Sequence, residues 1–114
     1  MIEIQEYVPA GRSTGSFRDW FLDLDTRGRQ LVDDAIARMR LGNLGNCKRV
    51  GSGVVERRID SGPGYRIYFG RDGDQLIILL GGGTKKQQSQ DILQARAIWK
   101  EYQHRKQRSD STWY

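Results

Sequence analysis

Apolar and polar residues recur along this chain with two different periods. Residues 2–8 alternate between apolar and polar side chains, which predicts a strand that ends at Pro9. From residue 16 onward the apolar residues recur every three or four positions, which predicts a short amphipathic helix over residues 16–24 with Ser16 as its N-cap. The apolar side of this helix consists of Phe17, Trp20, Phe21 and Leu24. This aromatic stripe indicates a core-facing helix.

A second helix is predicted from Thr26 or Arg27 to Leu41, because its apolar residues share one face and Gly42 is a favourable residue just past a helix end. A third helix is predicted over residues 90–104, with Ser89 as its cap. We expect one domain over residues 1–108 and a flexible tail over residues 109–114. The second helix should pack antiparallel to the first, forming a helical hairpin.

Three further strands are predicted over residues 54–60, 65–71 and 75–81. Their connections are too short for a parallel crossover, so they should form an antiparallel meander. Turn residues at 42–46 and 51–53 leave Lys48 and Arg49 in a short irregular segment. The predicted order is β-α-α-β-β-β-α, an α+β fold in which the hairpin packs on one face of a small, mainly antiparallel sheet. The other face of the sheet should then be open.

Composition limits the functional classes. The chain has 114 residues, 19 Lys and Arg against 14 Asp and Glu, a net charge of +5 and a single cysteine, Cys47. The excess of cations favours a polyanionic partner, and one cysteine rules out an internal disulfide. No apolar run approaches the length of a signal sequence or a membrane span, so we expect a cytoplasmic protein without membrane contact.

Cations lie within the predicted sheet, where a small domain would normally place neutral residues. Period two puts Arg58 on the same face as Glu56 and Asp60, and the hairpin register brings Arg66 beside it. Directly opposed arginines disfavour pairing unless a negative group lies near them. The partner is either internal, through Glu56 and Asp60 on a solvated face, or an external anion.

Glycines follow the last strand and favour the external anion. The Gly81-Gly82-Gly83 run delivers Lys85 and Lys86 close to a helix start, where free N–H groups attract phosphate. The spacing and the parallel strand-helix context of a P-loop are both absent.

Four segments in this order resemble the addiction-module killer proteins of the RelE/HigB toxin superfamily. They are residues 42–51, 54–59, 62–69 and 79–88, followed by Asp91-Ile92. The resemblance spans roughly residues 17–99 and implies a RelE-like fold. It also implies a bacterial type II toxin that cleaves mRNA on the ribosome and is neutralised by a co-encoded antitoxin, which we expect to be a helix-turn-helix protein.

The resemblance also implies roles for individual residues. Arg58 and Arg66 would hold the scissile phosphate, and Lys85 would be the basic residue that ends the last strand. Contacts to RNA or the ribosome would come from Lys48, Arg49, Arg57, Lys86 and Gln88. The 2′-OH would attack the adjacent phosphate to leave a 2′,3′-cyclic phosphate, without metal or other cofactor.

Arginine suits this chemistry because its guanidinium stays protonated and binds two oxygens at once. Lys85 or Lys48 is a candidate base, since like charges lower the pKa of a lysine. Candidate acids are Asp91, Tyr102 and His104. Two other functions stay open: a non-catalytic RNA- or ribosome-binding regulator on the same fold, and a phage-derived protein whose basic face serves a protein partner.

Overall fold

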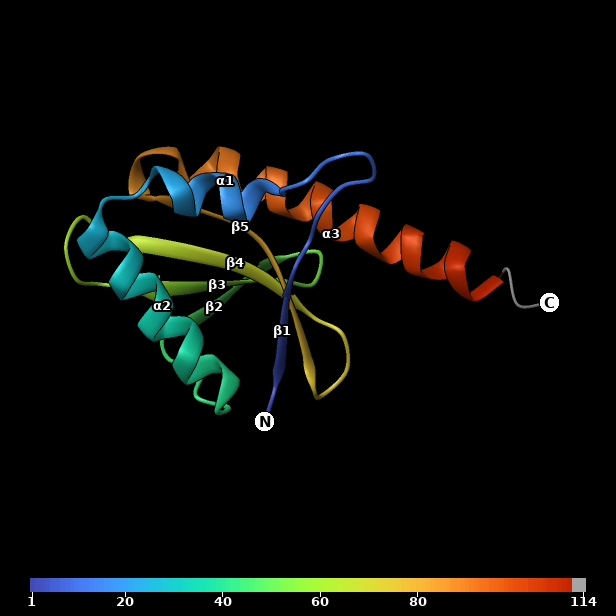
Figure 1. Ribbon diagram of the computed structural model, residues 1–114, viewed down its shortest axis with the longest axis horizontal. Helices are drawn as coiled ribbons and strands as arrows, with labels where there is room; N and C mark the ends of the chain where they lie inside the picture. Colours follow the sequence, from blue (N-terminus) through green and yellow to red (C-terminus); the bar gives the residue numbers. More distant parts are fainter. Residues whose placement is uncertain (112–114) are drawn as a thin grey trace.

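A computed structural model describes the backbone of residues 1–111 and the side chains of residues 1–108. Its five-stranded sheet has the order β1-β5-β4-β3-β2 (Figure 1). The strands are β1 (Glu3–Glu6), β2 (Cys47–Gly51), β3 (Val54–Ile59), β4 (Tyr65–Arg71) and β5 (Leu76–Thr84). The pairs β2·β3, β3·β4 and β4·β5 are antiparallel, whereas β1 runs parallel to β5. The protein is therefore an α+β protein with a mixed sheet.

Two short helices cover one face of this sheet. They are α1 (Ser16–Asp23) and α2 (Thr26–Arg40), and the Asp25 side chain caps α2 by accepting a 2.7 Å hydrogen bond from the N–H of Gly28. The predicted aromatic stripe of α1 lies in the core between these helices and β4 and β5, together with Ile67 and Phe69. This confirms the predicted helical hairpin and the apolar face of β4.

The other face of the sheet is not open, contrary to the sequence prediction. A third helix, α3 (Gln88–Ser111), follows a single 3₁₀ turn (Lys85–Gln87) and packs Ala95 and Trp99 against that face. Five apolar residues of the sheet and of the segment after β1 complete this second core: Tyr7, Val54, Tyr68, Ile78 and Leu80. α3 therefore covers part of the face that was predicted to be open.

Three further predictions differ from the structure. Ser16 is the first residue of α1 and not its N-cap, which is Gly15. The segment around Lys48 and Arg49 is not irregular but forms the edge strand β2, whose backbone pairs with β3. The final helix begins before Gln90 and continues to Ser111, so residues 109–111 belong to α3; the rest of the predicted tail lies outside the described residues. The pattern of apolar side chains identifies neither of the last two features. Strand β2 forms through backbone pairing with β3, and the last part of α3 is exposed and polar.

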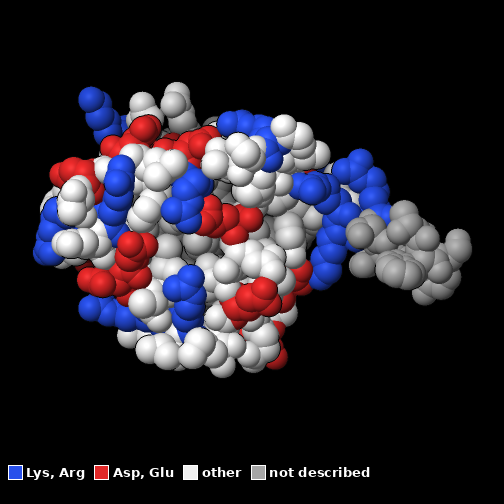
Figure 2. All heavy atoms as spheres, viewed as in Figure 1, with Lys and Arg blue, Asp and Glu red and all other residues white. Residues whose placement is uncertain are grey.

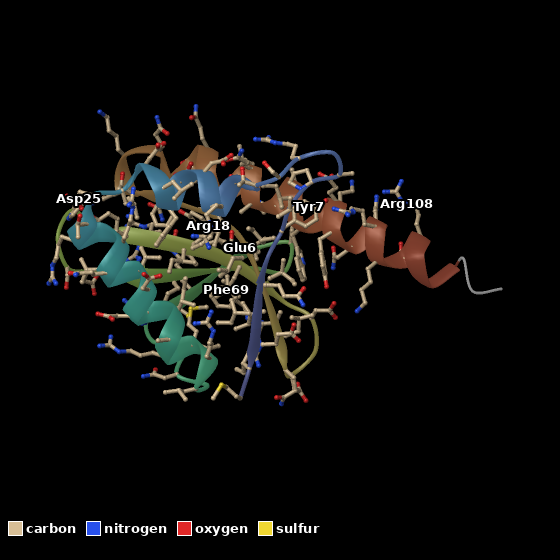
Figure 3. All side chains as sticks on the ribbon, in the orientation of Figure 1. Glu6, Tyr7, Arg18, Asp25, Phe69 and Arg108 are labelled. Carbon is tan, nitrogen blue, oxygen red and sulfur yellow. The ribbon has the colours of Figure 1, made fainter. Side chains whose placement is uncertain are left out.

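Ion pairs and hydrogen bonds join the termini of the domain to its centre. Arg18 of α1 bonds to Glu6 at the end of β1 (Figure 3). The Arg18 guanidinium also lies 5.0 Å from the ring centroid of Phe21. Arg105 donates a 2.9 Å hydrogen bond to the carbonyl of Val8, which holds α3 against the segment after β1.

Among the described residues, no helix has both the length and the apolar character that crossing a membrane requires.

Close packing on glycine holds α3 to the sheet. A Cβ atom at Gly70 of β4 would lie 2.5 Å from the indole of Trp99, so a side chain there would displace this buried ring. At Gly81 the nearest atom would be Ser16 Oγ at 3.6 Å, an ordinary contact.

We therefore expect Gly70→Ala to lower the free energy of unfolding by about 1–3 kcal/mol, the usual cost of overpacking a core. Gly81→Ala is the matched control and should change it by less than about 1 kcal/mol. Urea unfolding of both variants measures the difference. Equal stabilities would show that Trp99 does not need the space above Gly70.

A candidate anion site around Glu56

The strand register sorts the charged residues of the sheet onto its two faces. Lys48, Glu56 and Tyr68 are cross-strand partners in one row, and Arg58 and Arg66 are partners in the next row. Because partners in a ladder project to the same face, all five side chains belong to the face that α3 partly covers. The predicted pairing of Arg58 with Arg66 is confirmed.

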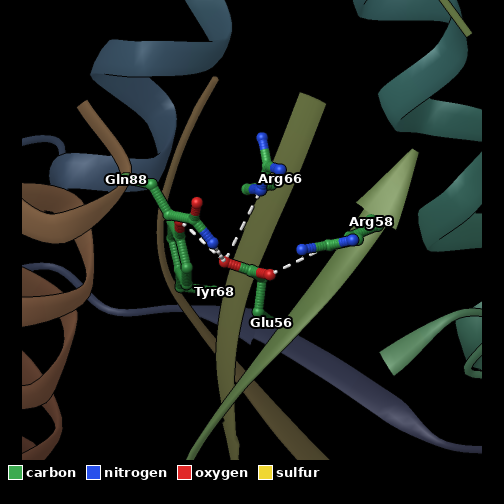
Figure 4. A network of polar contacts seen from close by, with 5 residues as sticks. All are labelled: Glu56, Arg58, Arg66, Tyr68 and Gln88. Carbon is green, nitrogen blue, oxygen red and sulfur yellow. Dashed lines mark hydrogen bonds and ion pairs between the residues drawn. The ribbon is translucent and has the colours of Figure 1, made fainter. Parts of the chain in front are cut away.

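Glu56 lies at the centre of a polar cluster that we call the Glu56 cluster: Glu56, Arg58, Arg66, Tyr68 and Gln88 (Figure 4). The carboxylate is 0% exposed, and both of its oxygens are engaged. Oε1 accepts a 3.3 Å hydrogen bond from Arg58 Nε. Oε2 accepts hydrogen bonds from the Tyr68 hydroxyl at 3.2 Å and from Gln88 Nε2 at 2.9 Å. A buried carboxylate is tolerated only when it is paired in this way.

The two arginines meet this carboxylate through their Nε atoms. Arg66 Nε lies 3.6 Å from Glu56 Oε2, an ion pair without a hydrogen bond. The Arg66 side chain is 9% exposed and that of Arg58 is 38% exposed. Among the described side chains, none hydrogen-bonds to the terminal nitrogens of either guanidinium. The site thus has two cations to one anion, with unused donors.

Gln88 links this cluster to the start of α3, where further cations lie. The side chains of residues 85–90 line a hollow of about 490 Å³ that includes Lys85 and Lys86. Both lysines are exposed. The dipole of α3 adds partial positive charge at this end of the helix. The neighbourhood of the Glu56 cluster is therefore suited to an anion.

Consecutive glycines of β5 place two side chains on opposite faces of the sheet. A Cβ atom at Gly82 would lie 2.1 Å from the ring of Trp20, and one at Gly83 would lie 2.0 Å from Asp91 Oδ2. Gly83 is the cross-strand partner of Arg66, so the Asp91 carboxyl lies beside the arginine row. Burial raises the pKa of Asp91 above the ordinary carboxyl value.

Tyr68 contributes a hydroxyl that keeps its proton. Burial raises its pKa, and the negative charge of Glu56 raises it further, followed by that of Asp91. The ring itself is 0% exposed and belongs to the core beneath α3. Tyr68 therefore acts as a fixed donor to Glu56.

The structure brings some of the predicted site residues together and separates others. Arg58, Arg66 and Gln88 belong to the Glu56 cluster, and Asp91 lies beside the arginine row. Lys48 is the exposed cross-strand partner of Glu56, and Lys85 and Lys86 follow directly after β5. Arg49 and Arg57 pair with Val55 and Cys47, so they belong to the opposite face. The buried guanidinium of Arg57 lies against Gly45, where a Cβ would be 1.2 Å from Nη1. It is thus not placed to share an anion with Arg58 and Arg66.

The other two candidate acids lie along α3, away from its first turn. The hydroxyl of Tyr102 donates a 2.5 Å hydrogen bond to Asp72, which follows β4 at the end of the strand opposite Tyr65. This hydrogen bond and burial raise the pKa of Tyr102 to about 12, with burial the larger cause. His104 is exposed two residues further on. Neither residue is brought to the Glu56 cluster.

Basic side chains also gather on the protruding part of α3, whereas acidic and basic residues are mixed over the body of that view (Figure 2). Several of these helix cations already have partners. Lys106 Nζ lies 2.7 Å from Asp72 Oδ1, and Arg105 bonds to the Tyr7 hydroxyl at 3.2 Å. Together with Tyr102 they line a hollow of about 970 Å³ between α3 and the segment after β1. These cations serve mainly to hold α3 in place.

Among the described side chains, no group of three or more His, Cys, Asp or Glu residues is placed to hold a metal ion. The sequence named Glu56 and Asp60 as possible internal partners of the two arginines, and the structure confirms this for Glu56. The sequence pattern predicted neither the central place of Glu56 in a five-residue cluster nor the contact between Gln88 and Glu56. The first had a signal, a glutamate two residues before Arg58 on the same strand face. The second joins residues 32 positions apart and had none.

By fold and site, the protein is a small α+β protein in which two arginines pair with one buried carboxylate. Over 91 residues it is 38% identical to an uncharacterized protein of Haemophilus influenzae, a match that covers 79% of this chain and 92% of the other. The chain belongs to the same family as that protein. No family model and no solved structure matches the chain.

Asp91 gives a prediction about stability and pH. Its pKa is raised in the folded protein, so folding favours the protonated carboxyl. This contribution is fully present below the unfolded-state pKa of about 3.9 and is lost as the pH rises through the folded-state pKa. Above the folded-state pKa, the ionised and partly buried carboxylate therefore destabilises the fold.

We expect Asp91→Asn to be more stable than the wild type at neutral pH, and the difference to disappear in acid. Asp60→Asn, at an exposed position, serves as the control and should follow the wild-type curve. Urea unfolding across this pH range provides the measurement. A less stable Asp91→Asn variant at neutral pH would mean that an unrecognised partner stabilises the carboxylate.

Proposed function

We propose that the protein is the toxin of a bacterial type II toxin–antitoxin module and that it cleaves mRNA on the ribosome. The observation that carries this proposal is the pair of arginines on Glu56, whose terminal nitrogens are unused beside a cationic helix start. The resemblance of the four sequence segments to the RelE/HigB superfamily supports it independently. On this proposal the protein acts in the cytoplasm, together with mRNA, the ribosome and its antitoxin.

The residues of the site support an intramolecular transesterification of the RNA backbone, without a covalent enzyme intermediate. The ribose 2′-oxygen attacks the neighbouring phosphorus as its proton passes to a base, for which Lys85 and Lys48 are the candidates. Arg58 and Arg66 stabilise the charge that develops on the phosphoryl oxygens. The bond to the 5′-oxygen breaks, which leaves a 2′,3′-cyclic phosphate on one fragment and a 5′-hydroxyl on the other.

Asp91 is the candidate acid that fits this site best. It lies beside the arginine row on Gly83, and its raised pKa favours the protonated form that a donor to the 5′-oxygen needs. A bound phosphate would raise this pKa further, because like charges disfavour ionisation. Tyr102 and His104 lie further along α3, away from the arginine pair, and are therefore poorer candidates to protonate the 5′-oxygen.

One observation favours the non-catalytic alternative, an RNA- or ribosome-binding regulator. Within the described side chains, the cluster holds two arginines and no histidine, since His104 lies further along α3. Such a site could bind a phosphate without transferring a proton. The two functions differ in whether the RNA backbone is cut.

We expect induction of the wild-type protein in a bacterial host to arrest growth and to produce mRNA breaks that primer extension maps between adjacent nucleotides. Arg66→Ala should reduce cleavage by about 100-fold or more, the usual effect of removing a donor that stabilises transition-state charge. Arg38→Ala removes the same charge from an exposed position on α2 and should cleave normally. Intact mRNA in cells that make the wild-type protein would contradict the nuclease but leave RNA binding possible.

A further inference from the structure

We propose that Glu56 is a positioning residue that orients Arg58 and Arg66 so that their terminal nitrogens hold the oxygens of one RNA phosphodiester. This inference rests on the proposed function and specifies how the site recognises its substrate. Glu56 itself touches no substrate, because its side chain is 0% exposed and donors occupy both of its oxygens.

The sheet imposes a problem that a carboxylate at this position solves. Arg58 and Arg66 are direct cross-strand partners, and like charges in this arrangement repel each other. Glu56 precedes Arg58 by two residues on the same face, and its two oxygens are divided between the arginines. The carboxylate therefore lets two guanidiniums lie side by side on adjacent strands.

The choice of nitrogen determines where the remaining donors point. A guanidinium is planar and has five N–H donors, of which only one belongs to Nε. Because both arginines meet Glu56 through Nε, the terminal nitrogens of each are left without a hydrogen bond to any described side chain. These terminal nitrogens carry four of the five N–H donors of each arginine, in the fork geometry that matches phosphate oxygens.

Gln88 and Tyr68 fix the carboxylate in turn. The Tyr68 hydroxyl, which rises from the core beneath α3, and the Gln88 amide, from the first residue of that helix, both donate to Oε2. The orientation of the fork is thereby coupled to the docking of α3. Lys85 and Lys86 precede Gln88 in the chain and add further positive charge at this end of α3.

The test is binding of a short single-stranded 2′-O-methyl RNA, which cannot be cleaved because its 2′-oxygen is blocked. Glu56→Gln removes one negative charge and so makes the net charge of the protein more positive by one. General electrostatic attraction would then strengthen its binding of RNA. If Glu56 orients the arginines, the same variant should instead bind about ten-fold more weakly, the equivalent of losing one charge-assisted contact. General electrostatic attraction and the positioning role of Glu56 thus predict opposite changes in the RNA affinity of this variant.

Glu6→Gln is the matched control, since Glu6 pairs with Arg18 on another part of the molecule. It makes the same change in charge and should bind the RNA as tightly as the wild type or slightly more tightly. Gln88→Ala, which removes one donor to Oε2, should weaken binding by a smaller factor than Glu56→Gln. Folded Glu56→Gln that binds as tightly as the wild type would overturn the inference.

A second measurement decides the matter if Glu56→Gln does not fold. In the wild type, NMR should show that the Nε–H signals of Arg58 and Arg66, assigned by their loss in Arg58→Lys and Arg66→Lys, are protected from solvent exchange, and the RNA should shift both. The absence of protected signals, or signals that ignore the RNA, would overturn the positioning role. If the protein binds the RNA as predicted but does not cleave mRNA in cells, the proposed nuclease activity is wrong, while the role of Glu56 in orienting the two arginines toward a phosphate is supported.

Discussion

The buried carboxylate of Glu56 is the constraint on which the rest of this structure depends. A carboxylate without access to water must be paired, and here the partners come from β3, β4 and α3 at once. Without its charge, two arginines would oppose each other across adjacent strands and a helix would lose its polar contact with the sheet. The same residue thus stabilises the end of the sheet and leaves a net positive charge there.

Glycine is the second constraint, because it lets large side chains lie directly on the strands. Trp99 covers Gly70 and thereby holds α3 to one face, while Trp20 covers Gly82 on the other. Asp91 covers Gly83 beside Arg66 and is half-buried as a result. The glycine run that ends β5 therefore builds the surroundings of the site, in addition to leading the chain toward Lys85.

Much of the fold followed from local pattern, and the failures have physical reasons. The aromatic stripe of α1 and the alternation in β3 and β4 predicted their helix and strands, and the register that pairs Arg58 with Arg66. The edge strand β2 was missed because backbone pairing stabilises it while Lys48 and Arg49 are exposed. The third helix was predicted, but its periodicity does not say which face of the sheet it covers. The alternation of side chains along a strand also places Arg57 on the face opposite Arg58, and the strand register shows the same arrangement.

The central claim is that Arg58 and Arg66, oriented by Glu56, hold a single phosphate of an RNA strand. A crystal structure of the protein with an uncleavable 2′-O-methyl RNA tests it most directly. The account predicts one phosphate with its oxygens within hydrogen-bonding distance of the terminal nitrogens of both arginines, and Nε of each still facing Glu56. RNA bound along the protruding part of α3, with the Glu56 cluster empty, would contradict it.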